Sequence, residues 1–142
     1  MLRRMLLVMG LVVILFFAHD RLGFYPSFVS LIGLALALMW IVAFLSALID
    51  NIPFTVTMIP IIGALSAEGV DVYPLWWALA IGVALGGNGT HIGATANIVV
   101  VAQAERSGLP NARITPLQWL RVGLPVMLSG LVVASLSFAL LF

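Results

Sequence analysis

A polar, glycine-rich stretch, GGNGTHIGATAN at residues 86–97, interrupts a chain whose neighbouring segments are strongly apolar. The stretch contains four glycines, two asparagines, two threonines and a histidine. Non-helical, polar backbone at membrane depth is tolerated only where it is buried in protein or lines a cavity. If the neighbouring segments lie in a membrane, this stretch therefore requires a partner at the same depth.

The composition indicates that these segments do lie in a membrane. Of the 142 residues, 63% are hydrophobic and 8% are charged, which is incompatible with a water-soluble domain of this size. The chain has no cysteine for disulfide or zinc chemistry, and its net charge of +1 offers no basic surface for nucleic acid. No arrangement of nucleophile, base and oxyanion donors is present, so we expect no enzyme and no cofactor.

We expect one all-α integral membrane domain over residues 1–142. The start of the chain has the charged and apolar regions of a signal peptide, but no small-residue cleavage site follows, so a retained helix is expected. The expected segments are an N-terminal helix and turn (1–26), a helix and re-entrant hairpin (27–74), a discontinuous helix (75–106) and a C-terminal helix (117–142).

The hairpin is inferred from segment lengths. Residues 27–49 are long enough to cross a bilayer, but they lead into DNIPFT at 50–55, whose proline and polar side chains favour opening of the helix. The apolar arm that follows, residues 56–65, has about half the length of a span. A half-length arm after a polar tip is typical of a segment that enters and leaves the membrane on one side.

The discontinuous helix is inferred in the same way, because the apolar runs 75–85 and 98–103 on either side of the polar stretch are each too short to cross. The basic residues then predict an orientation with the N-terminus in the cytoplasm of a cell (plasma or inner) membrane. The arginines assigned to the cytoplasmic side are Arg3, Arg4, Arg106, Arg113 and Arg121, whereas residues 66–74 carry only acids.

A tip and an unwound helix at the same depth can supply oxygen ligands to a small cation. The candidate binding residues are Asp50, Asn51, Thr55, Asn88, Gly89, Thr90, Thr95 and Asn97. The amides and hydroxyls suit Na⁺, for which the expected ligands are Asn51, Thr55, Asn88, Thr95 and Asn97, with Asp50 for charge compensation. Alternatively, Asp50 and His91 form a proton relay, so the coupling ion is Na⁺ or H⁺. The helices that begin beyond each polar loop also direct partial positive charge at an anionic group.

The segments SALIDNIPFTVTMIP and LWWALAIGVALGGNGTHIGATANIVVVAQAERSG resemble the C-terminal half of the ion transporter superfamily. The resemblance is strongest to its branch of arsenite permeases, melanosomal P proteins and sodium/proton antiporters, often labelled citrate transporter-like. It implies an elevator-type secondary transporter of two inverted repeats, each with a hairpin and a broken helix. The residues that correspond to the two motifs are Asp50, Asn51, Pro53 and Thr55 at the tip, and Gly86, Asn88, Gly89, Thr90, Gly93, Thr95 and Asn97 at the break.

Nothing in the chain duplicates the tip or the break, so the first repeat is absent and a complementary repeat or oligomer partner is required. One hypothesis is a transporter fragment or half that moves a small inorganic or carboxylate anion or arsenite, or exchanges Na⁺ for H⁺. The alternative is a truncated remnant or membrane interaction subunit that does not transport. In that interpretation Asp50 is a helix cap, the asparagines satisfy broken backbone, and the glycines and His91 serve packing. The four tryptophans are interpreted as helix-end anchors or lipid-facing residues.

Overall fold

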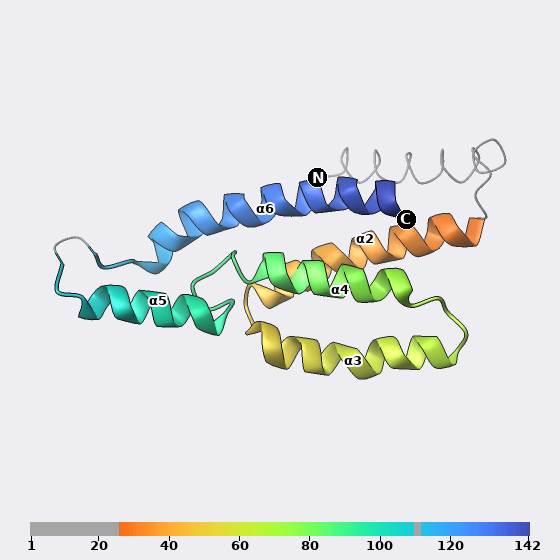
Figure 1. Ribbon diagram of the computed structural model, residues 1–142, viewed down its shortest axis with the longest axis horizontal. Coiled ribbons are helices and arrows are strands. Elements are labelled where there is room, and N and C mark those ends of the chain that lie inside the picture. The colour runs from red at the N-terminus through yellow and green to blue at the C-terminus, as the bar shows by residue number, and fades with distance from the viewer. Residues whose placement is uncertain (1–25, 110–111) are drawn as a thin grey trace.

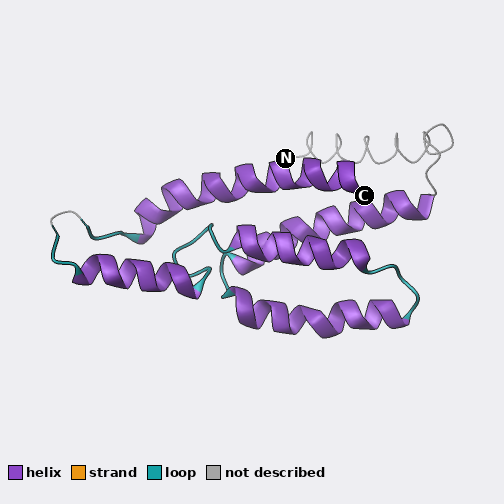
Figure 2. Ribbon diagram, viewed as in Figure 1, coloured by secondary structure: helices purple, strands orange, loops and turns teal. Residues whose placement is uncertain are grey.

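The computed structural model describes residues 26–109 and 112–142, and within these ranges every regular element is an α-helix (Figure 2). The predicted N-terminal helix and its turn lie outside the described residues. The helices are α2 (Pro26–Ser46), α3 (Asn51–Ala67), α4 (Tyr73–Gly86), α5 (Thr95–Arg106) and α6 (Pro116–Leu141). Of these, α2 and α6 are long and apolar enough to cross a membrane.

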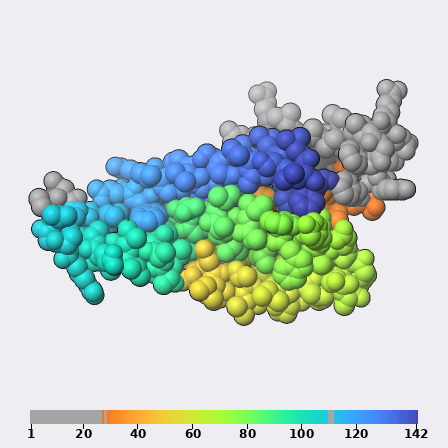
Figure 3. Space-filling view, in the orientation of Figure 1, coloured from red at the N-terminus to blue at the C-terminus, as the bar shows by residue number. Residues whose placement is uncertain are grey.

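The helices lie roughly along one axis of an elongated molecule (Figure 1). The main packing is between α2 and α4, which run in the same direction, while α3 and α6 also contact α4. The chain reverses between α2 and α3, and it leaves α4 for α5 at nearly the same position along this axis (Figure 1). From there α5 extends to one end of the molecule, where α6 begins (Figures 1 and 3). The two polar segments singled out in the sequence therefore lie at the same level.

Close contact between α2 and α4 depends on two glycines one turn apart. A Cβ atom on Gly82 would lie 2.6 Å from the carbonyl oxygen of Met39, and one on Gly86 would meet the backbone of Ala43. Both of these α2 residues are fully buried. Small residues let helix backbones approach closely in membranes, where packing rather than the hydrophobic effect holds helices together.

The α6 helix begins at a capping box, in which the Thr115 side chain and the Gln118 side chain bond reciprocally to backbone N–H groups. It then presents one buried stripe to the rest of the molecule. The buried residues of this stripe are Gly123, Met127, Leu131 and Phe138. The indole N–H of Trp40 on α2 donates to the Ser135 hydroxyl of α6 at 3.0 Å, so this tryptophan links two helices as well as contributing bulk.

The hairpin turn differs from the prediction in position. The helix was expected to open over 50–55, but the non-helical residues are 47–50 and α3 already begins at Asn51. Asp50 is the N-cap, and Pro53 falls in the first turn, where a missing N–H leaves no intrahelical bond unmade. Because the polar tip residues are helical, α3 has 17 residues and is longer than the predicted apolar arm. The non-helical part of the break, residues 87–94, lies inside the predicted stretch.

Candidate ion and substrate site

Four helix ends converge at the centre of the molecule (Figure 1). The C-termini of α2 and α4 bring backbone carbonyl groups to this point, and the N-termini of α3 and α5 bring backbone N–H groups. The two N-termini carry partial positive charge and the two C-termini carry partial negative charge. The convergence can therefore interact with ions of either sign.

The Asp50 carboxylate joins the two N-termini. One carboxylate oxygen accepts a hydrogen bond from the Ile52 N–H at 3.4 Å, which caps α3. The other accepts a hydrogen bond from the hydroxyl of Thr95, the first residue of α5. Asp50 is half-buried and Thr95 is exposed, so this pair lies at the surface of the described part of the chain. A single acidic side chain thus meets the positive ends of two helices.

The break is closed on itself by Asn97. Its amide nitrogen donates to the carbonyl oxygens of Gly87 at 2.8 Å and Thr90 at 3.1 Å. The Thr90 hydroxyl in turn donates to the carbonyl oxygen of Ala47, beyond the end of α2. These bonds satisfy carbonyl groups that the interrupted helices leave free, and they attach the break to the hairpin turn.

Asn51 has a similar role on the hairpin side. Its amide lies 2.6 Å from the Ser46 hydroxyl and faces two backbone carbonyl groups, so the nitrogen is the atom that fits there. In that orientation the nitrogen donates to the Gly93 oxygen at 2.9 Å and to the Val83 oxygen at 3.2 Å. The geometry thus shows both Asn51 and Asn97 bonding to broken backbone, which is the role that the packing interpretation assigned to them.

Three candidate residues make no side-chain hydrogen bond between the hairpin turn and the break. Thr55 donates its hydroxyl to the Asn51 carbonyl oxygen at 2.7 Å within α3. The exposed side chain of Asn88 donates to the Ala84 oxygen at 3.5 Å, and among the described residues His91 makes no hydrogen bond. No side-chain bond therefore links His91 to Asp50 in the described part of the chain.

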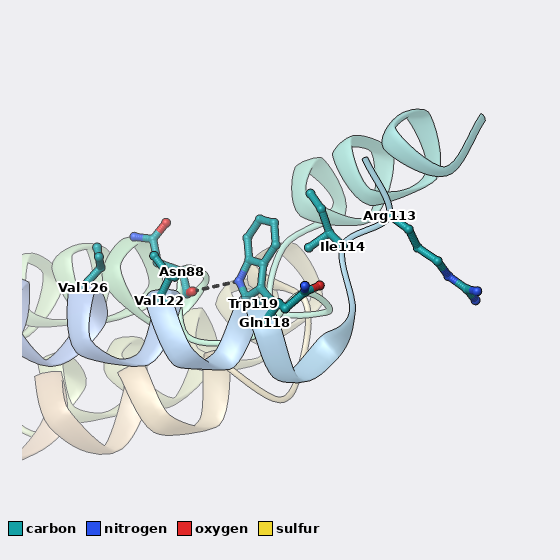
Figure 4. A pocket seen from close by; sticks show the side chains of 8 residues that line it. Asn88, Arg113, Ile114, Gln118, Trp119, Val122 and Val126 are labelled. Atoms are coloured by element: carbon teal, nitrogen blue, oxygen red, sulfur yellow. Dashed lines mark hydrogen bonds between the residues drawn. The ribbon is translucent and has the colours of Figure 1, made fainter. Parts of the chain in front are cut away.

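Asn88 instead lines a cavity of about 510 Å³ between the break and the start of α6 (Figure 4). Apolar side chains of α6, among them Val122 and Val126, form much of its wall. The indole of Trp119 points at the break, and its N–H donates to the carbonyl oxygen of Asn88 at 3.1 Å.

Gly89 is buried where the break, the hairpin turn and α6 meet. A Cβ atom at this position would lie 2.7 Å from the sulfur of Met127 and 3.1 Å from the Cβ of Ala47. A larger residue would force the flexible Met127 side chain to move and Ala47 to shift slightly, so the glycine permits the close packing seen here. Ligand binding by its backbone remains a proposal.

Two residues of this region were not identified in the sequence. Ser46 is fully buried, and its hydroxyl donates to the Val83 oxygen at 3.4 Å. The sequence signal for Ser46 was the presence of a single serine in an apolar segment, one turn before the polar tip. Trp119 was interpreted as an interface anchor, and nothing in the sequence indicates that its N–H reaches the break.

Comparisons with known proteins agree with the membrane architecture. The P protein of Homo sapiens is 44% identical over 105 residues, which is 72% of this chain and 12% of that protein. A protein of Synechocystis named as an uncharacterised transporter is 39% identical over 125 residues, which is 74% of this chain and 26% of the relative. The 46 kDa membrane protein of Mycobacterium leprae is 39% identical over 94 residues, covering 64% of this chain and 21% of that protein. No solved structure matches.

The chain therefore spans between about an eighth and a quarter of the length of these curated relatives. The sequence model of the citrate transporter family matches residues 4–82, more than half of the chain. Together with the P protein relatives, this match confirms the resemblance to the ion transporter superfamily inferred from the hairpin and break motifs. The chain belongs to the citrate transporter family.

Proposed function

We propose that this chain forms an ion- and substrate-binding fragment or half of a membrane secondary transporter that couples Na⁺ or H⁺ to the movement of a small anion. The proposed substrate is an inorganic or carboxylate anion. Transport of arsenite and exchange of Na⁺ for H⁺ are the alternative activities. In this proposal α2 and α3 form the re-entrant hairpin and α4 and α5 form the discontinuous helix. The observation that carries the proposal is the position of Asp50 between two helix N-termini.

The charge balance at this position suggests how a cation and an anion are coupled. Each helix N-terminus is equivalent to about half a positive charge, so the two N-termini together balance about one carboxylate. When Na⁺ or a proton neutralises Asp50, the two N-termini become available to the negative charge of a substrate. Ion binding and anion binding would then favour each other.

Asp50 and the first turn of α5 carry oxygen atoms that suit a sodium ion. The Thr95 hydroxyl bonds to the carboxylate, and in the described part of the chain no hydrogen bond reaches the amide oxygen of Asn97. Carboxylate, hydroxyl and amide oxygens are the ligands that hard cations prefer. Because Asp50 and Thr95 lie at the surface, an ion can reach them in the chain alone, and a complementary repeat or partner would cover the site.

The orientation proposed from the sequence fits the distribution of charge along the molecule. Arg106 ends α5 and Arg113 precedes α6 at one end, whereas Glu68 and Asp71 lie between α3 and α4 at the other end (Figure 1). We place the arginine end in the cytoplasm of a plasma or inner membrane, by the positive-inside rule.

The alternative function, a membrane subunit that does not transport, is favoured by one observation. The side chains of Asn51, Thr90 and Asn97 are already bonded to the backbone of the turn and break. Such a closed network stabilises an interrupted pair of helices whether or not an ion binds.

The two functions differ in whether ions stabilise the protein. The test is thermal unfolding of the 142-residue chain in nanodiscs, in sodium chloride and in choline chloride of equal ionic strength across pH. A ligand at ten times its dissociation constant stabilises the folded state by about 1.4 kcal/mol, so an increase of several degrees in the midpoint is expected.

Thr95→Val should abolish most of the sodium effect because it removes the hydroxyl beside Asp50. Thr57→Val is the matched control, since the Thr57 hydroxyl is bonded within α3 to the Pro53 oxygen at 2.9 Å and lies outside the cluster. If sodium and pH leave the wild-type midpoint unchanged, the subunit that does not transport is the better interpretation.

A further inference from the structure

We propose that Trp119 is a positioning residue, which holds the break in the conformation that presents the Thr95 hydroxyl to Asp50. The proposal deepens the proposed function, since it assigns to α6 the control of the geometry of the ion site. It starts from the hydrogen bond between the Trp119 indole N–H and the Asn88 carbonyl oxygen, at 3.1 Å.

Within the break, the Asn88 carbonyl oxygen accepts its hydrogen bond from α6. The Asn88 N–H still bonds to the Leu85 oxygen at 3.1 Å, as a continuation of the last turn of α4. Its carbonyl oxygen, in contrast, accepts from a side chain of another helix, so the indole replaces a bond that a continuous helix would have supplied. Trp119 therefore fixes the backbone at the first step away from α4.

The same face of α6 shapes the break at two further positions. A Cβ atom on Gly123 would collide with the Asn88 oxygen and would lie 3.0 Å from the Trp119 indole nitrogen. One turn further along, the fully buried Met127 packs against Gly89. Residues 119, 123 and 127 are spaced one helical turn apart, so the break packs against one face of α6.

A short path of bonds leads from this stripe to the site. Gly87 and Thr90, on either side of Asn88 and Gly89, both accept from the Asn97 amide. Asn97 lies in the first turn of α5, which begins with Thr95, the residue bonded to Asp50. A displacement of the break would change where α5 begins, and therefore where the Thr95 hydroxyl lies.

The cavity beside Trp119 makes the indole bond important for this geometry. Asn88 and Trp119 both line this space of about 510 Å³, so packing alone does not enclose the break on that side (Figure 4). Removal of the indole N–H would leave the Asn88 carbonyl facing the cavity without its donor.

The test is hydrogen–deuterium exchange of Trp119→Phe in the 142-residue chain in nanodiscs. Loss of one hydrogen bond should speed exchange in peptides that cover residues 86–97 by about fivefold, while peptides from the middle of α2 exchange as in the wild type. Trp40→Phe is the matched control, because it also removes an indole bond to α6, at 3.0 Å from Ser135, but at a distance from the break. Unchanged exchange in the break, or equal acceleration in both variants, would overturn the proposal.

A spectroscopic measurement on the unmutated chain avoids dependence on variants that fold poorly. In protein labelled with ¹⁵N-tryptophan, a bonded Trp119 indole N–H should exchange with deuterium several times more slowly than the exposed Trp77 indole. Equal rates would count against the bond. Sodium titration of the same signal tests the proposed function separately, since a protected indole signal that does not respond to sodium would contradict the ion site and leave the positioning role supported.

Discussion

At the scale of single residues, Asp50 combines two roles that substitution can separate. It caps α3 through the Ile52 N–H, and it carries the charge that lies against α5. Asparagine is as good an N-cap as aspartate, whereas alanine is a poor one. Asp50→Asn should therefore retain the free energy of unfolding within about 0.5 kcal/mol, while Asp50→Ala should lose about 1 kcal/mol.

Both Asp50 variants should lose the response to sodium, because both lack the carboxylate. Thr115→Ala serves as the control, since it removes the cap of α6 at a similar cost of about 1 kcal/mol but should leave the sodium response intact. Detergent-induced unfolding with and without sodium measures both quantities. A normal sodium response in Asp50→Asn would show that the charge has no part in ion binding.

The two asparagines of the break should differ in their contribution to stability. Asn97 makes two bonds to carbonyl groups, so Asn97→Ala should lower the free energy of unfolding by about 2 kcal/mol. The Asn88 side chain is exposed and makes one long bond of 3.5 Å, so Asn88→Ala should cost less than about 0.5 kcal/mol. Equal losses in the two variants would contradict this assignment of their roles.

The sequence predicted which residues are polar at membrane depth, but not which of them meet. Thr95 and Asn88 belong to the same stretch, yet only Thr95 bonds to Asp50. The direction of each side chain depends on the path of the non-helical residues, and that path is set by contacts with α2 and α6. Composition and spacing along the chain do not contain these contacts.

At the scale of elements, the glycines of α4 and α3 serve different purposes. Gly86→Ala should destabilise the protein by about 1–3 kcal/mol, because the added Cβ meets the Ala43 backbone of α2 and neither element can yield easily. Gly63→Ala should be neutral or stabilising by up to about 1 kcal/mol, because nothing lies within 4 Å of its Cβ position and alanine favours the helix. Unfolding midpoints measured side by side decide the matter, and similar losses would argue against tight α2–α4 packing.

The boundaries of the elements show why the sequence predicted the existence of the break better than the position of the turn. The three glycines of residues 87–94 lower the helix propensity of this segment, so an interruption here is favoured by the local sequence. Asp50, Asn51 and Pro53, in contrast, suit an N-cap and a first turn as well as they suit a loop. The turn instead lies at residues 47–50, and the apolar residues 47–49 themselves give no sign of an interruption.

At the scale of the whole molecule, the described helices leave the candidate site uncovered. Asp50 is only half-buried, Thr95 is exposed, and α5 has no buried residue among those described. The relatives are about four to eight times as long as the region that matches this chain, which covers 12% to 26% of their length. Alternating access requires one bundle to move against another around the site. We therefore expect a larger assembly to carry out transport.

The corresponding prediction is that these 142 residues do not transport by themselves. Purified chain in liposomes under a sodium or pH gradient should show no uptake of small anions above empty liposomes. Single cysteines introduced beside Glu68 and beside Arg113, labelled from outside, would establish the orientation in the same preparation. Two identical chains in opposite orientations could supply two sites, but the arginines at one end disfavour insertion in both directions. Robust uptake that is lost in Asp50→Ala would overturn this prediction, since it would mean that the hairpin and the broken helix need no second repeat to move against.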